Sequence, residues 1–448
     1  MEVFMLRRKV QPQIEEWINN GKDALLITGA RQTGKTYIIR KLLDENCDYI
    51  ELNFLERPEL IDLFETAKST KDLLMRISVA AERELKPGET FIFLDEIQKY
   101  PDIVTWIKFL VEEGSYKYIM SGLLLGIELK DIRSVPVGYL QVIDMYPMDL
   151  EEFFSAIGFQ QEIFKHIEKC WNERIAVDEY IHEKLLDAFY LYLIVGGMPE
   201  AVQVYIDTND IAKVTAIHDK IIRAYRWDFS QYEQDKKLKL SEIYDAIPGE
   251  LEEKNKRFFI NHVAGKVEFD RVKNDFLWLK NAGVAIPVYN VQELRKPLVV
   301  SEKRSLFKLF YSDVGLLTSR YPAIVKHQVL RRDASIKNGG LFENAVAQEL
   351  HAKNISERYY NSKQQGELDF IIEVDGEIIP LEVKSGKDYK KHSALQNVLN
   401  SDNNSVESAI VFSNNNLEEE GHILYAPIYM IMCVREQKMT DTIYSIQI

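Results

Sequence analysis

The feature that most constrains this chain is a glycine-bounded loop that directly follows a short apolar run. Residues 24–27 are Ala-Leu-Leu-Ile, and residues 29–36 read Gly-Ala-Arg-Gln-Thr-Gly-Lys-Thr. Glycines at the two ends let backbone N–H groups turn inward around a polyphosphate, while the lysine reaches the outer phosphates and the threonine hydroxyl offers a ligand to Mg²⁺. A helix is expected over 35–43. We therefore predict a nucleotide-binding loop formed by Gly29, Ala30, Arg31, Gln32, Thr33, Gly34, Lys35 and Thr36.

A second apolar run ends in two acidic residues. Residues 91–94 predict a short buried strand, and Asp95 and Glu96 follow it directly. Beside a phosphate-binding loop, the first acid orients Mg²⁺ and the second polarises the attacking water as a general base. Together with Lys35 and Thr36, this pair predicts a hydrolase for Mg·ATP. ATP is preferred over GTP because no Asn-Lys-x-Asp segment follows the loop in a fitting place.

Further strand candidates lie at 49–53, 116–120 and 140–145, with amphipathic helical stretches between several of them. Strands that alternate with helices predict an α/β fold with a parallel sheet. In folds where an extra strand separates the loop strand from the acidic strand, a polar residue at the end of that strand senses the γ-phosphate. Ser121 fits this place as a catalytic candidate, although Ser121 and Gly122 fit a simple turn equally well.

Composition limits the class of protein. The chain has 448 residues, which predicts about three domains. No apolar stretch approaches the roughly 18 residues that span a membrane, and Cys47, Cys170 and Cys433 are too few and too scattered for a disulfide framework. We therefore expect a cytoplasmic protein without membrane contact. The net charge of −14 opposes nonspecific attraction to polyanions, so any contact with DNA or RNA is expected to be local.

The middle of the chain is helical at first. Residues 150–236 have a helical, aromatic-rich pattern that is broken at Gly196-Gly197-Met198-Pro199. Several short helices follow, and then strands at 284–291 and 305–310, an order that is typical of a winged-helix-like module. The helix over 267–280 is the candidate recognition helix, but its apolar residues at 276–279 favour a packing role.

The C-terminal part contains a predicted β-hairpin. Asp375-Gly376 between two apolar runs is a strong signal for a two-residue turn. This turn sets Val374 opposite Glu377 and Asp369 opposite Glu382, in a pair whose Cα atoms approach to about 4.5 Å. Two carboxylates placed in this way repel each other unless a cation lies between them.

These carboxylates form a candidate metal site. Lys384 lies two residues beyond Glu382 and points to the same face, and Glu343, on a predicted helix over 341–351, is a third acid. A divalent metal (Mg²⁺ or Mn²⁺) held by Asp369, Glu382 and Glu343 would activate water for phosphodiester cleavage, with Lys384 as a catalytic residue. The alternative is a solvated face on which Lys384 pairs with Glu367 across the hairpin.

The order of the motifs resembles a known family. Besides the loop, they are Leu94-Asp95-Glu96-Ile97-Gln98-Lys99-Tyr100-Pro101, Tyr146-Pro147-Met148, Gly196-Gly197-Met198-Pro199-Glu200-Ala201 and the late Glu-x-Lys. The chain resembles the bacterial and archaeal AAA-type P-loop ATPases that carry a C-terminal domain of uncharacterised function. The resemblance covers essentially the whole chain and implies Walker A and Walker B roles for the loop and for Asp95-Glu96. It also implies a C-terminal α/β, restriction-endonuclease-like domain similar to PD-(D/E)xK nucleases.

Four domains are predicted from these patterns: a P-loop AAA-type ATPase domain at 1–155, a helical segment at 156–240, a winged-helix-like module at 241–325 and the nuclease-like domain at 326–448. Two functions follow. In one, ATP hydrolysis controls a metal-dependent nuclease-like domain that acts on or docks to nucleic acid. In the other, the chain is an ATP-dependent switch or interaction protein whose nuclease-like fold is catalytically silent. A protein partner or a homo-oligomer is also expected. An arginine supplied across a subunit interface would come from Arg133, Arg223 or Arg226.

Overall fold

The computed structural model describes residues 6–123, 138–232, 240–253, 255–264, 269–333, 335–336, 338–401 and 403–436. The chain divides into two compact units, and neither unit is one continuous segment. Unit 1 comprises Met1–Met148, Met198–Glu242 and Asp270–Ala285, and unit 2 comprises Asp149–Gly197, Ile243–Phe269 and Ile286–Ile448. This division is coarser than the four predicted domains, whose boundaries stay a prediction.

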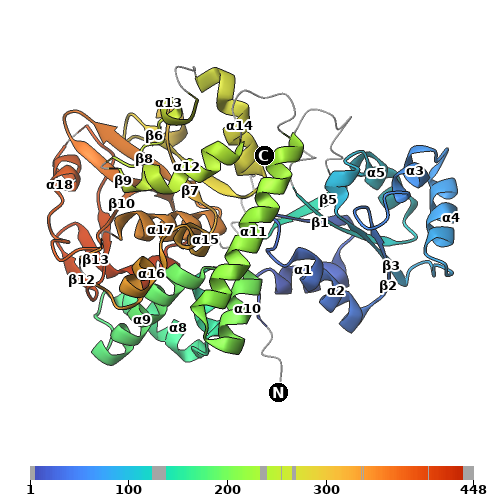
Figure 1. Ribbon diagram of the computed structural model, residues 1–448, viewed down its shortest axis with the longest axis horizontal. Coiled ribbons are helices and arrows are strands. Elements are labelled where there is room, and N and C mark those ends of the chain that lie inside the picture. Colours follow the sequence, from blue (N-terminus) through green and yellow to red (C-terminus); the bar gives the residue numbers. More distant parts are fainter. Residues whose placement is uncertain are drawn as a thin grey trace, which may run out of the picture. The chain divides into compact units, whose positions relative to one another are not determined.

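Unit 1 is built on a five-stranded parallel sheet with the order β2-β3-β4-β1-β5. Figure 1 shows β1, β2, β3 and β5 of this sheet. Its strands are β1 (Ala24–Thr28), β2 (Asp48–Asn53), β3 (Thr90–Asp95), β4 (Lys117–Gly122) and β5 (Leu140–Asp144). The predicted α/β class and all five predicted strands of this part are confirmed. Because β4 lies between β1 and β3, the carboxyl ends of the strands that carry the loop, the acidic pair and Ser121 are neighbours.

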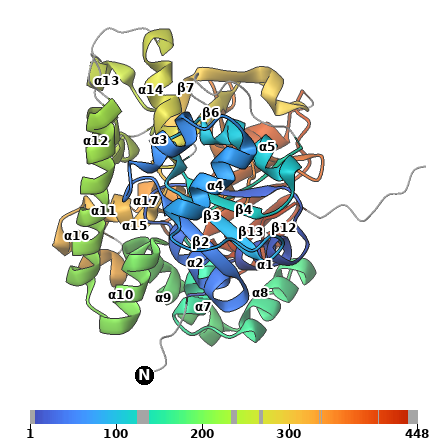
Figure 2. The same cartoon turned by 90° about the vertical axis from the view of Figure 1, so that its right-hand side faces the viewer.

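Helices cover both faces of this sheet. Successive residues of a strand point to opposite faces, so Leu25 and Ile27 of β1 pack with α1 (Gln11–Asn20) and α2 (Lys35–Asn46), whereas Ala24 and Leu26 face the other way. The second face is covered by α3 (Leu60–Glu65), α4 (Thr70–Ala80) and α5 (Ile103–Glu113), which Figure 2 shows lying over the strands. Burial on both faces explains why the central strands β1, β3 and β4 contain continuous apolar runs.

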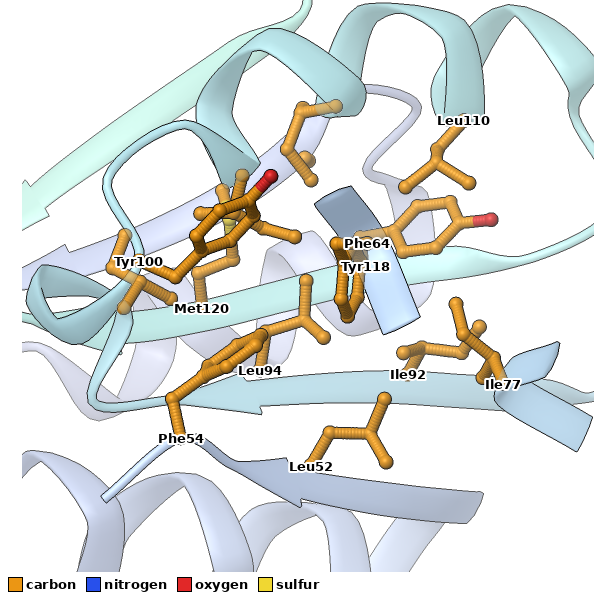
Figure 3. Close-up of a cluster of buried hydrophobic side chains, with 14 of the residues drawn as sticks. Leu52, Phe54, Phe64, Ile77, Ile92, Leu94, Tyr100, Leu110, Tyr118 and Met120 are labelled. Atoms are coloured by element: carbon orange, nitrogen blue, oxygen red, sulfur yellow. The ribbon is translucent and has the colours of Figure 1, made fainter. Parts of the chain in front are cut away.

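The core on the second face is formed by aliphatic and aromatic side chains. Figure 3 shows Leu52, Ile92 and Leu94 on neighbouring strands, with Phe64 and Ile77 of the covering helices packed against them. All five side chains are fully buried. Burying an aliphatic or aromatic side chain of this size contributes about 1.5–3 kcal/mol, so this face holds the strand ends in a fixed relation to one another.

Among the described residues, unit 1 contains further helices. They are α10 (Pro199–Thr208), α11 (Ile211–Tyr232) and α14 (Phe269–Asn281), the last beginning one residue before its segment of this unit. The helix break predicted at Gly196 to Pro199 is confirmed, because α9 (Glu179–Val195) ends immediately before it and α10 begins at Pro199. No single helix in the described part of the chain is long and apolar enough to cross a membrane, although α9 and α10 taken together satisfy the same criteria of length and composition.

Unit 2 contains an eight-stranded mixed sheet with the order β12-β13-β11-β10-β9-β8-β6-β7. Its strands are β6 (Ala285–Val291), β7 (Glu302–Tyr311), β8 (Arg358–Ser362), β9 (Gly366–Val374), β10 (Glu377–Val383), β11 (Ala409–Ser413), β12 (Glu418–Glu420) and β13 (Ile423–Pro427). Its helices are α7 (Leu150–Ala156), α8 (Gln161–Glu173), α9, α12 (Leu240–Glu252, from Ile243 onward), α13 (Ile260–Ala264), α15 (Val314–Ser319), α16 (Ala323–Leu330), α17 (Gly339–Ala352) and α18 (Ser393–Leu399).

The register predicted for the C-terminal hairpin is confirmed from the pair Glu377–Val374 to the pair Leu381–Phe370, and the predicted pair of Asp369 with Glu382, one step further, stays a prediction. β9 and β10 pair antiparallel, with Glu377 opposite Val374 and Pro380 opposite Ile371. Asp375 and Gly376 have φ values of 53° and 74°, as a two-residue turn between twisted strands requires. A restriction-endonuclease-like fold for this part of the chain stays a prediction.

The predicted winged-helix-like module is not confirmed. The strands expected at 284–291 and 305–310 exist as β6 and β7, but β6 also pairs in parallel with β8, so both belong to the large sheet of unit 2. The candidate recognition helix corresponds to α14, nearly all of which belongs to unit 1. The physical reason lies in β6, whose side chains are buried along almost the whole strand, as is typical of a strand within a larger sheet that is covered on both faces.

Candidate functional site

The loop predicted to bind phosphate has the backbone that its glycines predict. Gly29 has φ 140°, and a Cβ atom there would lie 2.1 Å from the carbonyl oxygen of Met145, so no other residue fits. Gly34, with φ 91°, is the N-cap of α2 and supplies no side-chain cap. The first N–H groups of α2 therefore lack a side-chain partner at the positive end of the helix, an arrangement that suits phosphate oxygens.

Lys35 is the first residue of α2 and reaches back into the loop. Its Nζ donates to the carbonyl oxygens of Gly29, at 2.9 Å, and Ala30, at 2.7 Å. Burial lowers the pKa of Lys35 to about 8, against the opposing effect of Glu96 and Asp95. An anion beside this ammonium would stabilise its charged form.

Asp95 lies at the centre of a polar cluster at the ends of β3 and β4. The Thr36 hydroxyl is 3.2 Å from both of its carboxylate oxygens, and the Asn53 amide donates to it at 3.0 Å. The Ser121 hydroxyl also donates to it. Burial raises the pKa of Asp95, and the hydrogen bonds from Ser121 and Thr36 oppose this shift. Asn53 was not predicted as a site residue, although it is the last residue of β2 and lies at the same edge of the sheet as Asp95.

Glu96 adopts a left-handed backbone conformation with φ 58°. Its carboxylate accepts a hydrogen bond from the side-chain amide of Gln98, whose own oxygen accepts from the backbone N–H of Leu123 at 3.1 Å. A Cβ atom on Gly122 would lie 2.8 Å from that Gln98 oxygen, so the glycine leaves room for the bridge. Gln98 therefore ties the predicted general base to the end of β4, and sequence reasoning gave it no role.

A cavity of about 1270 Å³ opens beside the loop. Its wall includes Lys35, Thr36 and Glu96, while the end of β4 contributes Gly122 and Leu123. Ser121 instead points to Asp95. One face of α10 also lines the cavity, with the residues Pro199, Glu200, Gln203, Ile206 and Asp207. Pro199 and Glu200 of the Gly-Gly-Met-Pro-Glu segment thus belong to the site, which the resemblance to a family motif did not specify.

Two arginines, Arg8 before the loop and Arg31 within it, connect the loop to neighbouring segments. Arg8 is 8% exposed, and its guanidinium donates to the carbonyl oxygens of Thr33 at 2.8 Å and Tyr146 at 2.6 Å. Arg31 pairs with Asp228 of α11 at 2.9 Å, and the Tyr225 hydroxyl donates to the Arg31 carbonyl oxygen at 3.2 Å. Arg223 and Arg226, predicted as candidates for an intersubunit arginine, lie on the same helix, and Arg133 lies outside the described residues.

The structure gathers the predicted C-terminal residues into a second cluster, within unit 2. Asp369 accepts a hydrogen bond from the backbone N–H of Val383 at 2.9 Å, and the Lys384 ammonium lies 2.6 Å from Glu382. Glu343 of α17 joins them but pairs with Lys256. The pair expected between Lys384 and Glu367 is not formed as such, because Glu367 contacts Lys308 at 3.0 Å and Asn361 at 2.7 Å.

Lys256 and Lys308 are the residues of this cluster that sequence reasoning missed. A signal was present, since Lys308 stands alone within the apolar run 306–310, and a lysine in a buried strand needs buried carboxylates. Across the residues that the structure describes, no group of three or more His, Cys, Asp or Glu side chains is arranged to hold a metal ion.

Comparisons with known proteins agree with the first site. A family model described as an AAA domain matches residues 21–154. Two families described only as domains of unknown function match residues 186–334 and 338–431. No curated protein sequence matches the chain.

Among solved structures, a Walker-type ATPase of Pyrococcus abyssi has 13% identity and a TM-score of 0.41, over 73% of this chain and 96% of its own. The Aeropyrum pernix ORC1 protein in complex with DNA has 14% identity and a TM-score of 0.30, over 73% and 93%. Domain III of the Thermotoga maritima replication initiation protein DnaA has 13% identity and a TM-score of 0.30, over 49% and 95%. Scores this low carry no conclusion about this chain. The family model, the loop and the parallel sheet together make residues 21–154 similar to an AAA domain.

Proposed function

We propose that unit 1 binds Mg·ATP and hydrolyses it. The observation that carries this proposal is the convergence of Thr36 and Asp95, whose oxygens lie 3.2 Å apart beside the Lys35 ammonium. A hydroxyl and a carboxylate at this spacing fit one hard cation such as Mg²⁺, which prefers oxygen ligands and keeps several waters. Mg²⁺ would neutralise charge that develops on the transferring phosphate.

The remaining roles follow from position. The N–H groups at the start of α2 and the Lys35 ammonium would bind the phosphates, while Asn53 and Ser121 hold the Asp95 carboxylate in place. Glu96 lines the cavity and would accept the proton of the attacking water. Gln98 positions that carboxylate. A γ-phosphate-sensing role for Ser121 remains part of the proposal, because a change at Asp95 would reach it through their hydrogen bond.

The proposal is tested by measuring phosphate release from ATP with the full-length chain. Glu96→Gln keeps the size of the side chain and removes the base, so turnover should fall by about 10²–10⁴-fold. Lys35→Ala should abolish turnover and weaken binding of a fluorescent ATP analogue. Glu45→Gln and Lys22→Ala change exposed residues of the same types and should behave as wild type. Undiminished turnover in both site variants would refute the proposal.

We further propose that ATP hydrolysis serves a molecular switch. The sequence predicts two versions of it, one that controls a metal-dependent nuclease and one whose nuclease-like part is catalytically silent. Lys256 and Lys308, which have no role in the nuclease version, lie among the C-terminal carboxylates and favour the silent version. Docking to DNA or RNA, a protein partner, a homo-oligomer and the cytoplasmic location stay predictions, and the charge of −14 limits nucleic-acid contact to local sites.

A further inference from the structure

A buried lysine lies among the C-terminal carboxylates, within ion-pair distance of two of the three expected metal ligands, Glu343 and Asp369. Lys308 of β7 is 0% exposed. Its Nζ lies 3.0 Å from Glu367, 3.6 Å from Glu343 and 3.9 Å from Asp369. The Lys308 ammonium also lies over the Tyr359 ring, 5.3 Å from its centroid, in a cation–π contact. A single cation of the protein itself is therefore surrounded by three carboxylates.

Two more lysines contact the remaining oxygens. Lys256 pairs with Glu343, and Lys384 pairs with Glu382 at 2.6 Å. Each of the three predicted metal ligands thus has a lysine ammonium within ion-pair distance. The carboxylates of Glu343, Glu367, Asp369 and Glu382 face three ammonium groups, so little negative charge is left for another cation.

The donor set does not fit a divalent metal. Mg²⁺ requires near-octahedral oxygen ligands at about 2.0–2.1 Å, and an ammonium at the same oxygens excludes it by volume and by charge. The cluster instead satisfies the rule that buried carboxylates are paired with a buried cation.

We propose that Lys308 is the built-in cation of this cluster and takes the place of a metal ion, so that Glu343, Asp369 and Glu382 hold unit 2 together rather than bind a catalytic metal. The cluster joins β7, β9, β10 and α17, together with Lys256 from the segment between α12 and α13. The proposal concerns unit 2 alone and does not depend on ATP hydrolysis.

The test is a titration of the full-length chain with Mn²⁺ in the absence of nucleotide, in which calorimetry measures the heat of binding. Wild type and Asp369→Asn should give the same isotherm. Lys308→Met removes the ammonium but keeps the length of the side chain, and should bind one additional Mn²⁺ at least about tenfold more tightly than wild type. The double variant Lys308→Met with Asp369→Asn should lose that extra site. Lys303→Met, an exposed change on the same strand, should titrate as wild type.

Two results would overturn the proposal. One is Mn²⁺ binding by wild type that Asp369→Asn abolishes, and the other is a folded Lys308→Met variant, checked by circular dichroism, that gains no site. If Lys308→Met does not fold, the comparison of wild type with Asp369→Asn still tests the proposal, because a difference in Mn²⁺ binding between these two chains would contradict it. Plasmid and single-stranded DNA should stay uncut with Mg²⁺ or Mn²⁺ in every nucleotide state, and cleavage that Asp369→Ala and Lys384→Ala abolish would also contradict it.

Discussion

The side-chain amide of Gln98 donates a hydrogen bond to the carboxylate of Glu96, and its oxygen accepts one from the Leu123 backbone. The proposed general base is therefore held by a residue whose own orientation is fixed by β4. This relationship links the proposed base to the strand end that carries Ser121.

Removing this bridge should lower turnover more than affinity. In Gln98→Ala, Glu96 loses one hydrogen bond to a charged group, which is worth about 1.5–3 kcal/mol, so we expect kcat to fall by roughly 10-fold to 100-fold with KM nearly unchanged. Steady-state phosphate release measures both constants. Gln13→Ala, an exposed change on α1, is the matched control. An unchanged kcat would show that Gln98 has no positioning role.

The Thr36 hydroxyl should be needed for the action of Mg²⁺. Thr36→Val keeps the shape of the side chain but removes the oxygen that lies 3.2 Å from Asp95, so we expect phosphate release to fall by roughly 100-fold. Thr36→Ser restores the oxygen and should restore most of the rate. EDTA should abolish turnover in wild type. Full activity of Thr36→Val with Mg²⁺ would contradict this role.

Asp313 should make stability depend on pH. It is fully buried, it accepts N–H groups from Gly197 at 2.6 Å and Leu316 at 2.9 Å, and burial raises its pKa to about 6. Because the folded state binds this proton more tightly than the unfolded chain, the contribution of Asp313 to stability falls as pH rises from about 4 to about 6.

The contribution of Asp313 to the free energy of unfolding should fall by about 3 kcal/mol over this pH range. Urea unfolding of wild type and Asp313→Asn between pH 4 and 7 would measure it, because the amide cannot titrate and the difference between the two chains isolates this group. A difference that stays constant over the range would contradict the assignment.

The hairpin turn provides a test of backbone strain alone. A Cβ atom at Gly376 meets nothing within 4 Å, yet φ is 74° there, so Gly376→Ala should reduce the free energy of unfolding by about 1 kcal/mol. Gly386 has equally open surroundings and no positive φ, so Gly386→Ala should be neutral or slightly stabilising. Equal free energies of unfolding for the two variants, measured in urea, would mean that the turn does not require its glycine.

Much of unit 1 could be predicted from local patterns. Apolar runs marked β1 to β5, and the loop motif specified Lys35 and Thr36, because both kinds of signal lie in neighbouring residues. The C-terminal register was predictable for the same reason, since the turn at Asp375-Gly376 sets the pairs from Glu377–Val374 to Leu381–Phe370.

Contacts between distant segments could not be predicted in this way. Arg8 supports the loop from the N-terminal segment, α10 lines the cavity from some 160 residues beyond the loop, and Lys308 reaches carboxylates on β9. Each contact depends on how the elements pack, and no spacing in the sequence encodes it. The pairing of β6 with β8 is also a contact between distant segments. Because the sequence does not reveal this pairing, the order of several helices followed by two strands predicted a winged helix instead.

The most direct test of the central claim is the chemical state of bound nucleotide after a single turnover. Wild type, Glu96→Gln and Lys35→Ala would each be mixed with a substoichiometric amount of radiolabelled ATP and Mg²⁺, separated from free nucleotide, and analysed for ATP and ADP. We predict ADP on wild type, unhydrolysed ATP on Glu96→Gln and almost no nucleotide on Lys35→Ala. Retention of equal nucleotide by Lys35→Ala, or none by wild type, would contradict the account.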